Sequence, residues 1–192
     1  MNMNRLVIGL VMALVMAVAL GRAGAEEMLL EGTVAATGIT TEIDTNTDGS
    51  KAGLNTGIFV SNLGRFTFQN ATELLPPSAP VDCPSGTFEA SILLNRNVLN
   101  HEDTGDQLFS QITSGALCLT TTGAFSFSVE ASFTGGTGQF AGARGSFIFD
   151  GTGAILISSA GRSFTTQTGE VTGILIIEED EDDDDEDDED DD

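Results

Sequence analysis

Two polar segments of the chain carry residue types that could bind a metal or do chemistry. In the first, Asp44, Asn46 and Asp48 precede Gly49, which matches the first half of an EF-hand loop. Alternate oxygen-bearing side chains on a curled backbone can point at one Ca²⁺, and the glycine permits the sharp turn. The twelfth position holds Asn55 instead of the bidentate glutamate. The segment predicts either a Ca²⁺ site at Asp44, Asn46 and Asp48 or an Asx-rich hairpin loop. We expect no other cofactor.

The second polar segment contains the one histidine of the chain, His101, followed by Glu102, Asp103 and Asp106. A single histidine cannot complete a three-histidine zinc site. A hydrolase base oriented by a neighbouring carboxylate is the alternative, but adjacent residues on a strand or loop seldom face each other. There is no nucleophile elbow, P-loop or dinucleotide fingerprint. We expect a solvated loop here, and the sequence favours a non-enzymatic protein while leaving catalysis open.

Residues 1–25 have the pattern of a secretory signal peptide. A basic residue precedes the apolar run Leu6–Leu20, and Ala23-Gly24-Ala25 forms a small-x-small cleavage site. We expect cleavage after Ala25, a secreted or periplasmic protein, and no membrane association after cleavage. An uncleaved anchor is the alternative, although the run is short for a full span.

Residues 178–192 form an unbroken acidic run. Such a block repels itself and cannot bury apolar area, so we expect a disordered tail. Loss of the signal peptide would leave five of the seven basic residues against thirty acidic ones, a net charge of −25. Nucleic acid is thereby excluded as a partner, because phosphate binding needs clustered Lys and Arg. We expect a solubilising tail, and binding of Ca²⁺ or basic partners is the alternative.

The two cysteines of the chain are Cys83 and Cys118. An even count in an exported chain predicts one disulfide. The bridge would close a loop of 36 residues and stabilise the fold by about 4 kcal/mol in the chain-entropy model. A free catalytic thiol is the alternative.

The body of the chain, residues 26–177, predicts one all-β domain. Its composition favours strands, and glycine interrupts them throughout. The clearest alternation is Ala124–Phe133, where phenylalanines take one face and Glu130 the other. Eight or more short strands indicate a sandwich or a closed barrel. Four expectations complete the pattern: an irregular loop over Leu74–Gly86, a polar turn over Asn97–Gln107, and separate strands over Ser146–Asp150 and Ala154–Ser158.

Phe133–Phe149 reads FTGGTGQFAGARGSFIF and predicts two strands joined by a glycine-dependent corner. Gly135, Gly136 and Gly138 can take a positive φ without steric cost. After the corner, Phe147 and Phe149 share one face of a strand.

The segment GGTGQFAGARGSF resembles the GGTGxFxxARG signature of plant dirigent proteins and the GGTGxFxGAxG signature of allene oxide cyclases. Secreted bacterial proteins carry similar motifs, and the likeness extends over about Gly105–Gly153. The resemblance implies a single antiparallel eight-stranded β-barrel with a central cavity, and it allows a homotrimer. In dirigent proteins the arginine of the motif acts with acidic cavity residues on a quinone-methide-like intermediate, which implies a catalytic role for Arg144. The acidic candidates are Glu42, Glu89, Glu130 and Asp150.

Two functions follow from these features. The first is a secreted binding or scaffolding module for a small apolar ligand, with no catalytic constellation. The second is a dirigent-like or cyclase-like protein that steers a reactive intermediate in the cavity. A cavity lined by phenylalanine favours the first, and a cavity in which Arg144 meets buried carboxylates favours the second.

Overall fold

The computed structural model of the protein describes residues 25–41, 49–75, 83 and 88–178. This part of the chain is all-β, as predicted, and residues Glu27–Ile177 form one compact unit. Its elements are β1 (Ala25–Thr41), β2 (Lys51–Ser61), β3 (Gly64–Leu74), β4 (Phe88–His101), β5 (Gln107–Leu119), β6 (Ala124–Gly136), the 3₁₀ helix η1 (Gly138–Phe140), β7 (Arg144–Ser159) and β8 (Arg162–Glu178).

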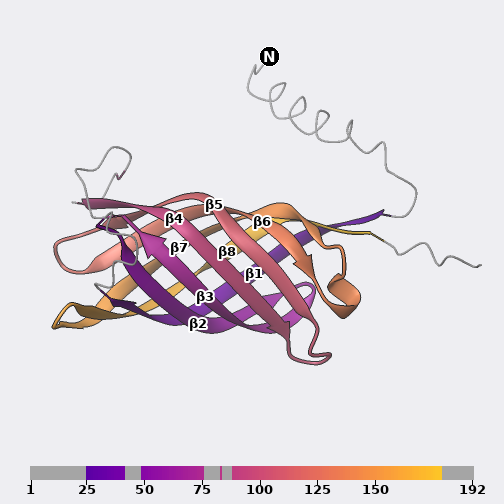
Figure 1. Cartoon of the computed structure of the whole chain (residues 1–192), viewed down its shortest axis with the longest axis horizontal. Coiled ribbons are helices and arrows are strands. Elements are labelled where there is room, and N and C mark those ends of the chain that lie inside the picture. The colour runs from indigo at the N-terminus through magenta and orange to yellow at the C-terminus, as the bar shows by residue number, and fades with distance from the viewer. Residues whose placement is uncertain (1–24, 42–48, 76–82, 84–87, 179–192) are drawn as a thin grey trace, which may run out of the picture. The chain divides into compact units, whose positions relative to one another are not determined.

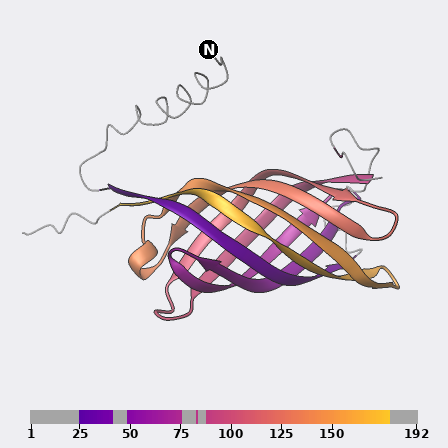
Figure 2. The same cartoon turned by 180° about the vertical axis from the view of Figure 1, so that it is seen from behind.

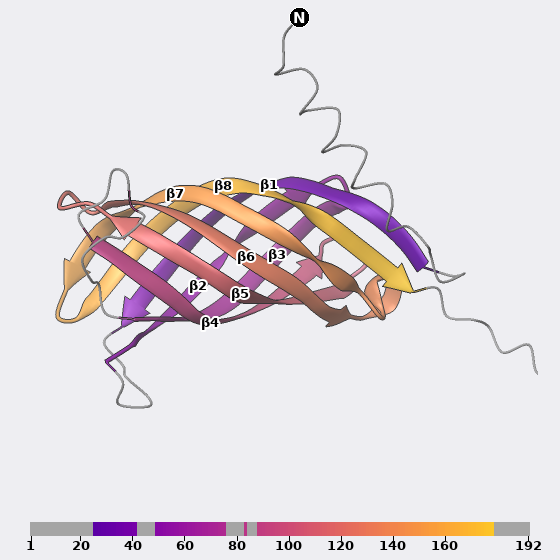
Figure 3. The same ribbon diagram turned by 90° about the horizontal axis from the view of Figure 1, so that it is seen from above.

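The eight strands form a closed ring. Each strand pairs antiparallel with the next along the chain, and β8 returns beside β1. At that junction the Thr166 hydroxyl of β8 donates to the Ala36 carbonyl of β1 at 3.5 Å. The strands cross the ring obliquely, as seen from the front (Figure 1), from behind (Figure 2) and from above (Figure 3). A closed ring exposes no unpaired strand edge to other chains.

Strand β6 shows how the sequence selects the inside of the ring. Phe125, Phe127 and Phe133 are buried, whereas Ser128 and Glu130 between them are exposed. Because successive side chains of a strand point to opposite faces, the phenylalanine face is the interior. Glu130, which the alternation places on the face opposite the phenylalanines, is exposed and points outward.

The interior of β6, β7 and β8 is built from phenylalanine rings that lie over glycines. Ring atoms lie close to the position that a glycine Cβ would take in three pairs: Phe125 over Gly153, Phe127 over Gly151 and Phe149 over Gly169. In most of these pairs the ring and the glycine face each other across neighbouring strands. Because these glycines have no side chain, the phenylalanine rings can occupy the space above them.

Two boundaries differ from the sequence predictions. Asn97–His101 belongs to β4, so the polar turn is limited to the residues that follow His101. Residues 146–158 lie in the single strand β7 instead of two strands. Both errors have one cause: asparagine and glycine are depleted in strands and usually mark turns. Here Asn97 lies in a strand and lines the interior, and Gly151 and Gly153 lie in a strand beneath the side chains of Phe127 and Phe125.

The glycine-rich corner between β6 and β7 is present and is pinned to the β4–β5 turn. The Gln107 amide donates to the Thr137 hydroxyl at 2.9 Å, and the Thr137 amide donates to the Gln107 carbonyl at 2.8 Å. Gly138 has a φ of 55°, as expected. Gly136 is different, because it is not among the residues of positive φ and is needed for space: a Cβ would lie 2.5 Å from the Phe140 carbonyl oxygen.

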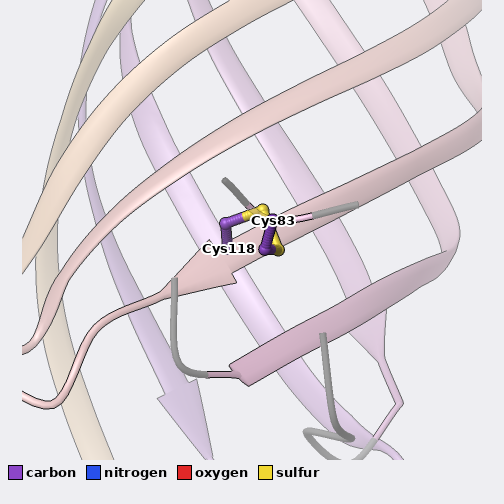
Figure 4. Close-up of a disulfide and its surroundings, with 2 residues drawn as sticks. All are labelled: Cys83 and Cys118. Carbon is purple, nitrogen blue, oxygen red and sulfur yellow. A yellow bond between two sulfur atoms is a disulfide. The ribbon is translucent and has the colours of Figure 1, made fainter. Parts of the chain in front are cut away.

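The disulfide between Cys83 and Cys118 is present, as predicted, with 5.5 Å between the Cα atoms (Figure 4). It ties Cys83 to the end of β5. Cys118 lies between Leu117 and Leu119, which both line the ring interior.

Several predicted features lie largely outside the described residues. Of the signal peptide predicted over 1–25 only Ala25, the first residue of β1, is described, and of the acidic tail predicted over 178–192 only Glu178, the last residue of β8. The Asp44, Asn46 and Asp48 loop and most of the proline-rich loop also lie outside. In the part that is described, no helix has the length and hydrophobicity needed to cross a membrane.

The packing of rings over glycines predicts that Gly151→Ala destabilises the protein. The new methyl group would crowd the Phe127 ring and lie 2.6 Å from the Thr168 carbonyl oxygen. We expect a loss of about 1–3 kcal/mol in the free energy of unfolding, measured by urea denaturation. Thr152→Ala, at the exposed neighbouring position, is the control. Equal stability of the two variants would contradict this packing.

Candidate functional site

The ring encloses a cavity of about 280 Å³ whose wall is mainly aromatic and aliphatic. The apolar wall includes Phe127 of β6 and Phe149 of β7, whose ring centroids are 4.8 Å apart in an edge-to-face arrangement. Phe133 and Phe147 form a second pair at 5.0 Å. Aromatic pairs at such distances stabilise a fold by about 0.5–1.5 kcal/mol beyond the area that they bury.

A row of amide side chains crosses the apolar wall. Asn55 of β2 pairs in register with Asn70 of β3, Asn70 with Asn97 of β4, and Asn97 with Ser110 of β5. All four residues line the cavity, and Ser110 is only 1 % exposed. We call Asn55, Asn70, Asn97 and Ser110 the amide row. Neighbouring inward residues on antiparallel strands have Cβ atoms about 4.5–5.5 Å apart, which lets their polar groups interact.

Hydrogen bonds join the amide row into two pairs. The Asn55 amide group donates to Asn70 Oδ1 at 2.7 Å. The Asn97 amide group donates to Ser110 Oγ at 3.1 Å. The Thr72 hydroxyl also donates to Asn70 Oδ1, at 3.3 Å. These bonds orient the side chains, and they leave further donor and acceptor capacity toward the cavity.

The end of the ring next to η1 is filled by Phe66, His101 and Phe140, which we call the aromatic plug. Phe66 is fully buried, and its ring lies 5.0 Å from His101 and 5.7 Å from Phe140. None of the three lines the cavity. Phe59 lines the cavity next to the plug, and its ring centroid lies 5.8 Å from that of Phe66. From Phe59 the cavity extends toward the opposite end of the ring of strands.

His101 is a structural residue of the plug and not part of a solvated loop, which corrects the sequence prediction. It is 8 % exposed. Its Nε2 lies 3.2 Å from the Leu63 carbonyl, and its Nδ1 lies 3.3 Å from the Thr104 amide nitrogen. Because a carbonyl only accepts and an amide N–H only donates, Nε2 carries the proton and Nδ1 accepts. Both ring nitrogens are thus engaged by the backbone.

The residues proposed for catalysis lie elsewhere. Arg144 begins β7 with an exposed side chain and does not line the cavity. Glu130 and Asp150 are also exposed on the outer face. Glu42 and the side chain of Glu89 are outside the described part of the chain. The structure does not bring Arg144 and carboxylates together in the cavity, and a catalytic role for Arg144 stays a prediction.

Metal binding gains no support from the residues whose placement is described. No three His, Cys, Asp or Glu side chains among them come together as a metal site requires. The candidate loop with Asp44, Asn46 and Asp48 lies outside this part of the chain, so the Ca²⁺ prediction is neither supported nor contradicted.

The amide row was not recognised from the sequence. Asn70 is the first residue of an Asn-Ala-Thr sequon, which indicates a surface asparagine, yet it faces the cavity and pairs with Asn55. A signal was present in the strand pattern: Phe66, Phe68 and Asn70 stand at every second position, so Asn70 shares the face of the two buried phenylalanines.

Comparison with known proteins gave no match: no family model fits the sequence, and no curated protein or solved structure is significantly similar to it.

The environment of His101 predicts that His101→Leu destabilises the fold. The substitution leaves the Leu63 carbonyl and the Thr104 amide without their partner, at a cost of about 1–3 kcal/mol in the free energy of unfolding. Urea denaturation measures the loss. The control is Glu102→Leu, which removes an exposed ion pair with Arg65 and should change stability by less than about 1 kcal/mol. If the two variants are equally stable, the plug is not held together by His101.

Proposed function

We propose that the protein is a non-enzymatic binding module that holds a small, largely apolar ligand inside the ring. The observation that carries the proposal is the cavity of about 280 Å³, whose lining includes Phe127, Phe133, Phe147 and Phe149. Pockets for drug-sized ligands typically measure about 300–1,000 Å³. A ligand at the lower end of this range would replace water against an apolar wall, which the hydrophobic effect favours.

The same proposal includes the architecture and location expected from the sequence. We infer that the ring is a small β-barrel of the allene oxide cyclase and dirigent type, which the corner at Thr137 and the closure of eight strands support. Barrels of eight strands can hold one small ligand. The disulfide between Cys83 and Cys118 fits an exported protein, since such bonds persist in oxidising compartments.

The alternative function, steering of a reactive intermediate, has less support from the geometry. It needs Arg144 and carboxylates to converge on the ligand, but Arg144, Glu130 and Asp150 are exposed on the outside of the ring. The lining residues in the described part of the chain include one charged side chain, Lys51. Binding without chemistry is therefore the better-supported function.

Binding can be tested with naphthalene, an apolar probe with two fused rings. A ligand that binds the folded state raises the unfolding temperature by mass action. We expect naphthalene to raise the midpoint measured by circular dichroism for the wild-type protein. Ile155→Trp should abolish the shift, because Ile155 lines the cavity and the larger side chain occupies it.

The matched control is Leu156→Trp. Leucine and isoleucine are isomers, so the two substitutions add the same volume, but Leu156 is 62 % exposed. The Leu156 variant should keep the naphthalene shift. The proposal is wrong if naphthalene leaves the wild-type midpoint unchanged, or if the two variants respond alike.

A further inference from the structure

We propose that the amide row recognises one uncharged polar group, a hydroxyl or a carbonyl, on an otherwise apolar ligand. This inference rests on the proposed function and specifies the ligand class: small, neutral molecules with an apolar body and a single hydrogen-bonding group. The row consists of Asn55, Asn70, Asn97 and Ser110, which all line the cavity.

The first support is unused hydrogen-bonding capacity within the row. The pair of Asn55 and Asn70 uses one polar atom of each amide, whichever way the amides are turned. Asn97 likewise gives its amide group to Ser110 and keeps Oδ1 unpaired within the described part of the protein. Ser110 accepts that bond, and its own hydroxyl proton has no acceptor among the described residues.

The second support is burial. Ser110 is 1 % exposed and the three asparagines are partly buried, in a lining that is mainly phenylalanine, leucine and isoleucine and also includes Thr165 and Gln167. Buried polar groups almost always have a partner, either protein or water, because an unpaired one is costly. Water can satisfy the row when the cavity is empty of ligand. A ligand that displaces this water must supply a donor or acceptor in its place, since otherwise it loses affinity.

The geometry of the row suits a single hydroxyl or carbonyl group. Asn70 and Asn97 face each other in register on neighbouring strands, where Cβ atoms lie about 4.5–5.5 Å apart. A ligand hydroxyl beside them can accept from the Asn70 amide group and donate to Asn97 Oδ1. A carbonyl oxygen can accept from Asn70 and from the Ser110 hydroxyl.

The charge of the cavity selects against ionised ligands at this position. Amides and a hydroxyl cannot neutralise a buried carboxylate, and burial of an unpaired charge is highly unfavourable. Among the described lining residues Lys51 is the charged side chain, and it lies four residues before Asn55 on β2, about 13 Å along the strand. No described cation of the lining therefore lies next to a carboxylate held at the row.

The test compares naphthalene, 2-naphthol and 2-naphthoate, which share one apolar body. The chain has no Trp and no Tyr, so the emission of each probe can be titrated without interference from the protein. At neutral pH, where 2-naphthol is uncharged, we expect it to bind about tenfold more tightly than naphthalene, the gain of one or two net hydrogen bonds. We expect 2-naphthoate to bind more weakly than 2-naphthol.

Asn97→Leu should remove most of the preference for 2-naphthol, measured as the ratio of the naphthalene and 2-naphthol dissociation constants of the same variant. Circular dichroism shows separately that the variant is folded. The control is Asn100→Leu, the same substitution on the opposite face of β4, where Asn100 accepts a hydrogen bond from Gln107 at 2.7 Å. This control should keep the preference.

The outcomes separate the two proposals. If naphthalene and 2-naphthol bind the wild-type protein equally, the inference about the amide row is wrong and the apolar cavity stands. The inference is also wrong if 2-naphthoate binds most tightly, or if Asn97→Leu keeps the full preference. If none of the three probes binds, the proposed function fails and the inference fails with it.

Discussion

The contact between phenylalanine rings and inward glycines is the constraint on which the rest of the structure depends. Phe125 and Phe127 of β6 lie over Gly153 and Gly151 of β7, and the Phe149 ring of β7 lies over Gly169 of β8. A ring that takes the space above a glycine of the neighbouring strand can lie against the wall instead of in the centre. The interior therefore remains open beside the rings, and the eight strands enclose a cavity in place of a fully packed core.

The two ends of the interior differ in how they are filled. At the end that holds η1, the aromatic plug of Phe66, His101 and Phe140 closes the space, and the corner that supplies Phe140 is pinned by Thr137 and Gln107. Beyond the plug, polar side chains interrupt the apolar wall along β2 to β5, where the amide row lies, and also on β8 at Thr165 and Gln167. The ring thus combines a plugged end with polar positions in an apolar wall, an arrangement that can orient a ligand as well as hold it.

The sequence predicted the features that depend on local alternation and missed those that depend on register. The inward phenylalanines of β6 and the glycine-rich corner follow from residue types a few positions apart, and the structure has both. Asn70 and Asn97 are 27 positions apart in the sequence, and only the pairing of β3 with β4 makes them neighbours. Asparagine is also uncommon in strands, so Asn97 was assigned to a turn.

Polar neighbours misled the interpretation of His101 for a related reason. The exposed acidic residues Glu102 and Asp103 follow it, but His101 is the last residue of β4 and is buried. Resemblance to the dirigent motif gave weight to Arg144, whose place at the start of β7 is exposed. A motif can thus indicate the fold of a corner through its glycines while the charged residue within it faces solvent.

The central claim is that the ring holds a stable, apolar, ligand-accessible space, and xenon binding in crystals tests it most directly. Xenon occupies apolar cavities without needing any polar partner. In crystals pressurised with the gas, the account predicts xenon density inside the ring against Phe127 and Phe149, at a distance from the amide row. An interior filled by side chains, with no xenon bound, would contradict the account.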